Sequence, residues 1–216
     1  MKALLTAILL ATLAWLPGPA NAAPAGQTPQ AGTDYVEIAD GKPWAAKPGR
    51  IEVAEVFGYS CPHCAQLEPQ LQAWKARQKR DVNFVAIPAA FGGPWDTWAR
   101  AYFAAANLGL LARTHQATFD AVHGTGALPR NPSEAELAAF FAGYGVDAAK
   151  FRAAMADPKV DAQLKQAAAV ARAWQLEGTP TLVVAGRYRV IGHDFPEMLR
   201  TADWLLARER QAAKRP

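Results

Sequence analysis

Residues 55–69 read EVFGYSCPHCAQLEP, and this stretch decides the fold of the 216-residue chain. It contains the only two cysteines of the sequence, Cys61 and Cys64, with a proline and a histidine between them. The apolar alternation of residues 51–57 predicts a strand that ends just before the pair. A helix is predicted to begin at the cysteines. The Cys-x-x-Cys motif is therefore expected at the point where a strand gives way to a helix.

The start of a helix favours a thiolate, because its first N–H groups are unpaired and the helix dipole is positive there. This placement predicts that Cys61 is the nucleophile and that Cys64, one turn further on, is the shielded resolving thiol. Pro62 fits the first turn, where no N–H is needed. We expect His63 to favour the Cys61 thiolate further. A stabilised thiolate favours the reduced form, so the oxidised pair is predicted to donate its disulfide readily.

The first 22 residues have the features of a secretory signal peptide. Residues 3–16 form an uncharged apolar run after Lys2. This run is shorter than the roughly 20 residues that a membrane-spanning helix needs. Residues 20–22, Ala-Asn-Ala, match an A-x-A cleavage site, and we expect cleavage after Ala22. The mature protein is therefore expected in the periplasm, an oxidising compartment.

The composition excludes several classes of protein. With 51% hydrophobic and 19% charged residues, the chain is neither disordered nor collagen-like, and two cysteines are too few for a disulfide-dense mini-protein. The net charge is only +4, and the basic residues at 208–215 are expected to form a frayed end, so no nucleic-acid partner is predicted.

The spacing of the cysteines argues against a structural cross-link. A disulfide that closes a four-residue ring is worth roughly 2 kcal/mol, against about 4.7 kcal/mol for a 100-residue loop. A pair that stabilises so little, in a protein predicted to be exported, is expected to be present for its reactivity.

A Cys-x-x-Cys motif can also supply half of a zinc site, with His115 and His123 as further ligands. These histidines are eight positions apart, which does not match the usual His-x3–5-His spacing, and they fall on a predicted helix away from the motif. We expect both to be helix-surface or helix-end residues. No metal and no other cofactor is predicted.

The order of predicted elements is strand, strand, helix, strand, a block of helices, hairpin and helix. Residues 23–33 are expected to be a flexible leader. The pattern divides the rest into one domain formed by residues 34–93 and 169–216 and an inserted helical domain at 94–168. Predicted strands cover residues 35–38, 51–57, 82–88, 181–185 and 187–191. Predicted helices run from the cysteines to about residue 79, from about 94 to 109, from 110 to 123 and from about 196 to 211. Three more helices are predicted to begin at the capping box of Ser133 with Glu136, at Asp147, and at Asp157-Pro158.

Three further features have a candidate role. Glu55 lies among apolar residues on the predicted face of its strand, where burial would raise its pKa; the alternative is a strand-edge carboxylate in water. Thr179-Pro180 falls between a helix and a buried strand, where a proline marks a defined bend and where we expect a cis bond. The aromatic residues Trp95, Trp98 and Tyr102 share a helical face and are expected to be core residues of the inserted domain.

The residues of 55–69 and the Gly178-Thr179-Pro180 segment resemble the thioredoxin superfamily. The Cys-Pro-His-Cys motif, the inserted helices and the signal peptide resemble the DsbA family of periplasmic thiol:disulfide oxidases. The resemblance implies an α/β fold, a thioredoxin-like mixed sheet with an inserted all-helical domain. It also implies a Cys61–Cys64 disulfide that is passed to newly exported proteins through a mixed disulfide, and an inner-membrane quinone-linked reoxidase of the DsbB type. The protein would act as a monomer.

Residue by residue, the resemblance implies that Cys61 is exposed and Cys64 is buried. Pro180 would be cis and face the disulfide, and the backbone of Thr179 would pair with an extended substrate. The same resemblance implies that Glu55 assists proton movement at Cys64, and that Pro69 is a proline that kinks the helix, a structural role.

Two other functions are compatible with the same residues. One is a disulfide isomerase or reductase on the same scaffold, although the short leader leaves no room for the extra dimerisation domain of isomerases. The other is a non-catalytic, chaperone-like peptide binder that uses the groove beside Pro180.

Overall fold

The computed structural model describes residues 28–214, so the predicted signal peptide at 1–22 lies outside the described residues. Of the predicted leader, residues 28–33 are described. Residues 30–34 form a hydrogen-bonded turn, in which the N–H of Asp34 donates to the carbonyl of Gln30 over 2.8 Å. Between residues 28 and 214, no helix combines the length and the apolar character needed to cross a membrane.

The centre of the fold is a five-stranded mixed sheet in the order β1-β5-β4-β2-β3. The strands β2 and β3 are parallel, and the other neighbours are antiparallel. In the register, Val56 near the end of β2 lies opposite Thr181 at the start of β4. The chain that leaves β2 and the chain that enters β4 therefore meet at one end of the sheet. The strands are β1 (Tyr35–Glu37), β2 (Ile51–Phe57), β3 (Val82–Pro88), β4 (Thr181–Val184) and β5 (Tyr188–Val190).

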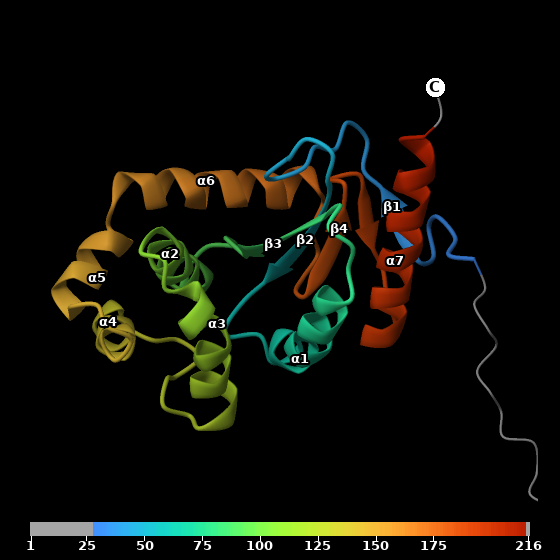
Figure 1. Cartoon of the computed structure of the whole chain (residues 1–216). Coiled ribbons are helices and arrows are strands. Elements are labelled where there is room, and N and C mark those ends of the chain that lie inside the picture. The colour runs from blue at the N-terminus through green and yellow to red at the C-terminus, as the bar shows by residue number, and fades with distance from the viewer. Residues whose placement is uncertain (1–27, 215–216) are drawn as a thin grey trace, which may run out of the picture.

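Helices cover both faces of this sheet (Figure 1). The helices α1 and α7 pack on one face, and the block from α2 to α6 extends from the other (Figure 1). The elements are α1 (Pro62–Ala76), α2 (Pro94–Asn107), α3 (Leu111–Phe119), the π-helix η1 (Asp120–Gly124), α4 (Glu134–Ala142), α5 (Ala148–Met155), α6 (Pro158–Ala173) and α7 (Phe195–Ala212).

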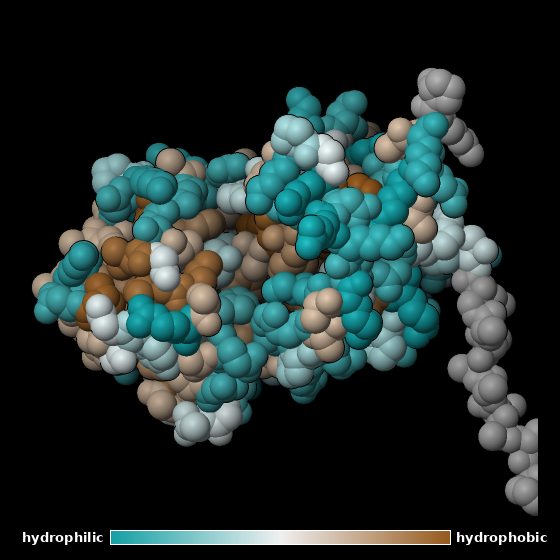
Figure 2. Space-filling view, viewed as in Figure 1, coloured by the Kyte–Doolittle hydropathy of each residue, from teal (hydrophilic) through white to brown (hydrophobic). Residues whose placement is uncertain are grey.

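The sheet separates two apolar cores. Leu67 and Trp74 of α1 pack with Leu205 of α7 against Val53 and Val184 of the sheet, and this core excludes water from one face. On the other face, the larger core joins β2 to the inserted helices. Trp98 and Tyr102 of α2 are 2% and 7% exposed and belong to it, so their predicted core role is confirmed. Figure 2 shows a mostly hydrophilic surface around these cores, with hydrophobic residues gathered over the inserted helices.

Local signals in the sequence placed most elements correctly. The capping box of Ser133 with Glu136, and the side-chain caps of Asp147 and Asp157, are all present. The turn between β4 and β5 is Ala185-Gly186, as predicted. Both residues have positive φ (54° and 65°), as the central residues of a type I′ turn do, and the N–H of Arg187 closes the turn on the carbonyl of Val184 over 2.9 Å.

Two helices differ from the prediction. The helix α1 continues through Pro69 but ends at Ala76 rather than near Lys79. The chain must turn there to enter β3, and the N–H of Val82 donates to the carbonyl of Lys79 over 3.0 Å to close that turn. The predicted helix over 110–123 is also interrupted, because α3 ends at Phe119 and continues as the wider π-turn η1.

Substitution of Ser133 tests the capping of α4. The Ser133 hydroxyl accepts the N–H of Glu136 over 3.2 Å, and the Glu136 carboxylate accepts the N–H of Ser133 over 2.8 Å. We expect Ser133→Ala to lower the free energy of unfolding by about 1 kcal/mol in urea titrations. Ser133→Thr, which keeps the hydroxyl, is the matched control. Equal stability of the two variants would show that this cap contributes nothing.

Candidate active site

Cys61 is the N-cap residue of α1. Its backbone is extended (φ −82°, ψ 117°), and its Sγ accepts the N–H of Cys64 over 3.4 Å. A turn closed by a 3.0 Å bond from the N–H of Cys61 to the carbonyl of Gly58 delivers it from the end of β2. Both cysteines are free thiols. A sulfur thus occupies the position that a serine or aspartate oxygen usually takes at a helix start.

This position lowers the pKa of Cys61 to about 5, against an ordinary value near 9. The hydrogen bond from the Cys64 thiol is the largest cause, and burial opposes it. Smaller contributions come from a hydrogen bond of the Thr179 side chain and from the backbone N–H groups of Cys64 and His63. The Cys61 thiolate is therefore the dominant form at neutral pH, as the helix-start argument predicted.

The side chain of His63 is exposed, and its backbone N–H is among the groups that lower the pKa of Cys61. The tuning role expected of the imidazole stays a prediction. The structure corrects the expected exposure of Cys61. The residue is only 8% exposed, and it shares its groove with Phe91, Trp95 and residues 177–179.

Cys64 lies one turn further along α1 and has no exposed surface. Burial is the main reason that its pKa is raised far above the ordinary value, and the hydrogen bond to Cys61 acts in the same direction. The two thiols of one motif therefore differ strongly in acidity. Cys61 is stable as a thiolate, whereas Cys64 holds its proton.

Glu55 of β2 is a buried acid behind this pair. The residue is 1% exposed, and its Oε1 has no hydrogen-bond partner. Burial, and then the negative charge of Glu68, raise the pKa of Glu55 to about 8. The expected direction of this pKa is thus confirmed, and the carboxyl is mostly protonated at neutral pH.

The segment Gly178–Pro180 faces the motif from the entry to β4. The Thr179–Pro180 peptide bond is cis, as expected. The thiol of Cys61 lies 3.4 Å from the carbonyl oxygen of Thr179, although the two residues are 118 positions apart. The antiparallel pairing of β2 with β4 brings these segments together.

A groove of about 380 Å³ opens beside Cys61. Phe91 and Trp95 form one wall, and the segment from Glu177 to Thr179 forms the opposite wall. Phe91 is 42% exposed, and its ring lies 5.4 Å from that of Trp95. Trp95 was expected to be a core residue; it is partly buried and packs against the larger core, and it also lines this groove. The sequence indicated only a break in the pattern at residues 91–93, so nothing in it identified Phe91.

His115 is not the helix-surface residue that the pattern allowed, whereas His123 lies at the end of η1, as the helix-end alternative predicted. Both are partly buried, and both bond to Tyr59, which lies two residues before Cys61. The inserted helices pack over the end of β2, and this packing turns both histidines inward. Within residues 28–214, no group of three or more His, Cys, Asp or Glu side chains is arranged to hold a metal ion.

Comparison with known proteins gives a consistent result. The model of the DSBA-like thioredoxin domain family matches residues 52–202. The chain is 39% identical over 188 residues to the thiol:disulfide interchange protein DsbA of Pseudomonas aeruginosa, covering 86% of this chain and 88% of that protein. It is 40% identical over 184 residues to the DsbA of Azotobacter vinelandii, covering 84% of this chain and 85% of that protein.

Solved structures agree with the sequence matches. The oxidoreductase DsbA from Xylella fastidiosa is 52% identical, with a TM-score of 0.83, covering 85% of this chain and 98% of that chain. The oxidoreductase NmDsbA1 of Neisseria meningitidis is 28% identical, with a TM-score of 0.72, covering 86% of this chain and 96% of that chain.

The low pKa of Cys61 predicts how the stability of the reduced protein depends on pH. The folded pKa of about 5 is below the unfolded value, so the thiolate stabilises the fold above pH 5 and this contribution is lost as the pH falls through 5. At pH 7 we expect the thiolate to add on the order of 2 kcal/mol to the free energy of unfolding, a value discounted for the partial contact of Cys61 with solvent. Cys61→Ser removes the effect.

The measurement is urea unfolding of reduced wild type and reduced Cys61→Ser at pH 4 and pH 7. The advantage of the wild type is expected to grow between these two values. A constant difference, or an ordinary thiol titration in the absorbance near 240 nm, would contradict the low pKa.

Proposed function

The chain belongs to the DSBA-like thioredoxin domain family and is a thiol:disulfide oxidoreductase, and we propose that Cys61 and Cys64 form the disulfide that it donates to substrate proteins. The resemblance inferred from residues 55–69 is confirmed by the family match. The difference in acidity between the two thiols is the single observation that supports donation over acceptance of a disulfide. A protein that stabilises one thiolate stabilises its own reduced form, which makes its disulfide a better oxidant.

Catalysis begins with attack on the Cys61–Cys64 disulfide. A substrate thiolate attacks the Sγ of Cys61, because Cys61 lines the groove and Cys64 has no exposed surface. A new bond joins the substrate sulfur to Cys61, and the bond to Cys64 breaks. Cys64 leaves with the electron pair and takes up a proton, since its pKa is raised. Glu55, protonated near neutral pH, is the proposed proton donor.

A second substrate thiolate then attacks the substrate sulfur of the mixed disulfide. The bond to Cys61 breaks, and Cys61 leaves as a thiolate that the start of α1 stabilises. The substrate has gained a disulfide and lost two electrons, and the protein now holds the dithiol. We propose that an inner-membrane reoxidase of the DsbB type removes these electrons.

The groove beside Cys61 is the proposed substrate site. The groove has an apolar wall formed by Phe91 and Trp95. The backbone of Gly178 and Thr179 also lines it. An extended substrate can pair with this backbone next to Pro180, while a side chain that flanks its cysteine contacts the aromatic wall. The proposed substrate is therefore an unfolded exported chain with free cysteines. Pro62 at the rim completes the site, and His63 is proposed to tune it from the exposed side.

The proposed organisation and location follow the same reasoning. Residues 34–93 and 169–216 form the thioredoxin-like domain, and residues 94–168 form the inserted helical domain. We propose a monomer that is exported to the periplasm through a signal peptide at residues 1–22.

Substitution of each cysteine tests the mechanism. Cys61→Ala is expected to abolish oxidative refolding of a reduced, unfolded substrate, because the attacked sulfur is gone. Cys64→Ala is expected to accumulate mixed disulfides with exported proteins, visible on non-reducing gels, since the resolving thiol is missing. A peptide-binding chaperone would keep its full effect in Cys61→Ala. An isomerase or reductase would instead show a Cys61–Cys64 disulfide that resists reduction by glutathione.

Phe91→Ser tests the aromatic wall. For a cysteine peptide with an apolar flanking residue, we expect KM to rise about fivefold, because roughly half of a Phe side chain is buried on binding. The rate with glutathione, which does not reach the wall, is expected to stay unchanged. Phe91→Leu is the matched control that keeps an apolar wall. Equal KM values for apolar and polar peptides in the wild type would exclude this subsite.

A further inference from the structure

Tyr59 is bonded from two sides by histidines of the inserted helices. Its hydroxyl lies 2.8 Å from Nδ1 of His115, and its carbonyl oxygen lies 2.7 Å from Nε2 of His123. Tyr59 is 1% exposed and lies in the turn between Gly58 and Cys61. One side-chain bond and one backbone bond therefore connect the inserted domain to the turn that delivers the nucleophile.

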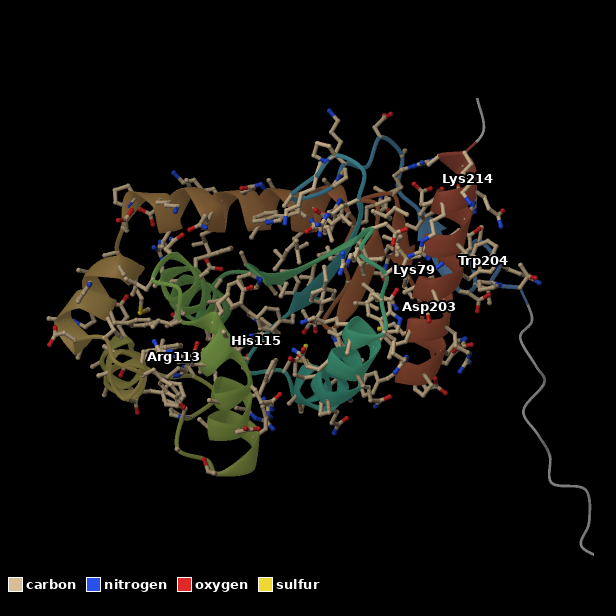
Figure 3. The ribbon with its side chains drawn as sticks, viewed as in Figure 1. Lys79, Arg113, His115, Asp203, Trp204 and Lys214 are labelled. Carbon is tan, nitrogen blue, oxygen red and sulfur yellow. The ribbon has the colours of Figure 1, made fainter. Side chains whose placement is uncertain are left out.

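The chemistry of the partners assigns the donors. A carbonyl oxygen can only accept, so Nε2–H of His123 donates to Tyr59. Nε2 of His115 lies 3.6 Å from a carboxylate oxygen of Glu68, which also only accepts, so a hydrogen on Nε2 is favoured. The other nitrogen, Nδ1, is the one that shares a hydrogen with the Tyr59 hydroxyl over 2.8 Å. Glu68 is 1% exposed and also accepts from Gln72. Figure 3 shows His115 between α3 and α1.

The charges near Glu68 are consistent with this assignment. Burial raises the pKa of Glu68, but the neighbouring His115, Gln72 and Lys75 outweigh it, so that the pKa is lowered overall. Burial is also the main reason that the pKa of Tyr59 is raised well above its ordinary value. Glu68 is therefore an anion that attracts the Nε2 side of His115, and Tyr59 keeps its hydroxyl hydrogen at neutral pH.

The π-helix η1 explains how two histidines eight positions apart reach the same residue. In a regular α-helix, such positions point about 80° apart. A π-turn contains more residues per turn, so each residue adds less rotation. The switch to η1 after Phe119 brings His123 back towards the face of His115. Single π-turns are frequent at functional sites.

We propose that His115 and His123 are positioning residues that hold Tyr59, and through it the Gly58–Cys61 turn, in the conformation that makes Cys61 reactive. This inference rests on the proposed nucleophilic role of Cys61. Among the described residues, the backbone of this turn makes one internal hydrogen bond, from the N–H of Cys61 to the carbonyl of Gly58. The two histidine contacts of Tyr59 therefore orient the peptides between these two residues. If the turn moves, Sγ of Cys61 loses its place beside the N–H of Cys64 and the carbonyl of Thr179.

The environment of His115 makes it suitable for substitution. It lines a cavity of about 570 Å³ between α1, α3 and β3, which is larger than the groove and does not include Cys61. A leucine side chain therefore has room there. The ring of Tyr59 packs against Phe57 and Phe119, with centroid distances of 5.1 Å in both cases, so we expect the aromatic core, and with it the fold, to survive the loss of one hydrogen bond.

The test compares each histidine with two replacements. His115→Leu and His123→Leu remove the bond, whereas His115→Asn and His123→Gln keep a polar group near the bonding nitrogen. The pKa of Cys61 in the reduced protein is read from thiolate absorbance near 240 nm. We expect each leucine variant to raise this pKa by about one, the loss of roughly one hydrogen bond, and each amide variant to restore most of the difference. The equilibrium constant for oxidation of glutathione by the Cys61–Cys64 disulfide should fall about tenfold in parallel.

Two further variants complete the experiment. His193→Leu replaces an exposed histidine of the β5–α7 connection and is expected to leave the pKa of Cys61 unchanged. Tyr59→Phe removes only the hydroxyl and is expected to reproduce His115→Leu, which settles the case if a leucine variant fails to fold. Folded leucine and phenylalanine variants with the wild-type pKa of Cys61 would overturn the proposal. Because the pKa is measured without substrate, this result is separate from a failure of the proposed oxidase activity.

Discussion

The sulfur of Cys61 caps the first turn of α1, and the chemistry of the site depends on this one interaction. A capping side chain normally satisfies an unpaired N–H of a helix start with an oxygen. Here the capping atom is the reacting atom, since Sγ accepts the N–H of Cys64. The Cys64 thiol contributes most to the low pKa of Cys61, and the N–H groups of Cys64 and His63 add to it, so residues of the first turn of α1 stabilise the thiolate. Reduction and ionisation of the pair strengthen the start of α1, and this is why a disulfide at this position is readily given away.

Burial then distinguishes the two cysteines. Cys61 borders the groove, whereas Cys64 and Glu55 lie behind it without contact with water. The same apolar surroundings raise the pKa of Cys64 and of Glu55, because a buried charge is costly. Cys61 is therefore the sulfur that we propose a substrate attacks, because it borders the groove. Cys64 is the leaving group that needs a proton, because it is buried.

The inserted helices contribute to the site in two ways. Trp95 at the start of α2 forms a wall of the groove, and its ring lies where any side chain at Gly58 would have to go. His115 and His123 hold the turn before Cys61 from the other side. The insertion therefore shapes both the surface that a substrate meets and the loop that carries the nucleophile.

The sequence by itself determined the order of the elements, the helix start at the cysteines, and the caps of α4, α5 and α6. Each of these depends on residues a few positions apart, and local hydrogen bonds and apolar periodicity decide them. Only the tertiary structure decided that Thr179 faces Cys61, that Trp95 borders the groove as well as the core, and that η1 turns His123 inward. These outcomes depend on which distant surfaces pack together, and a pattern of neighbouring residues contains no record of that packing.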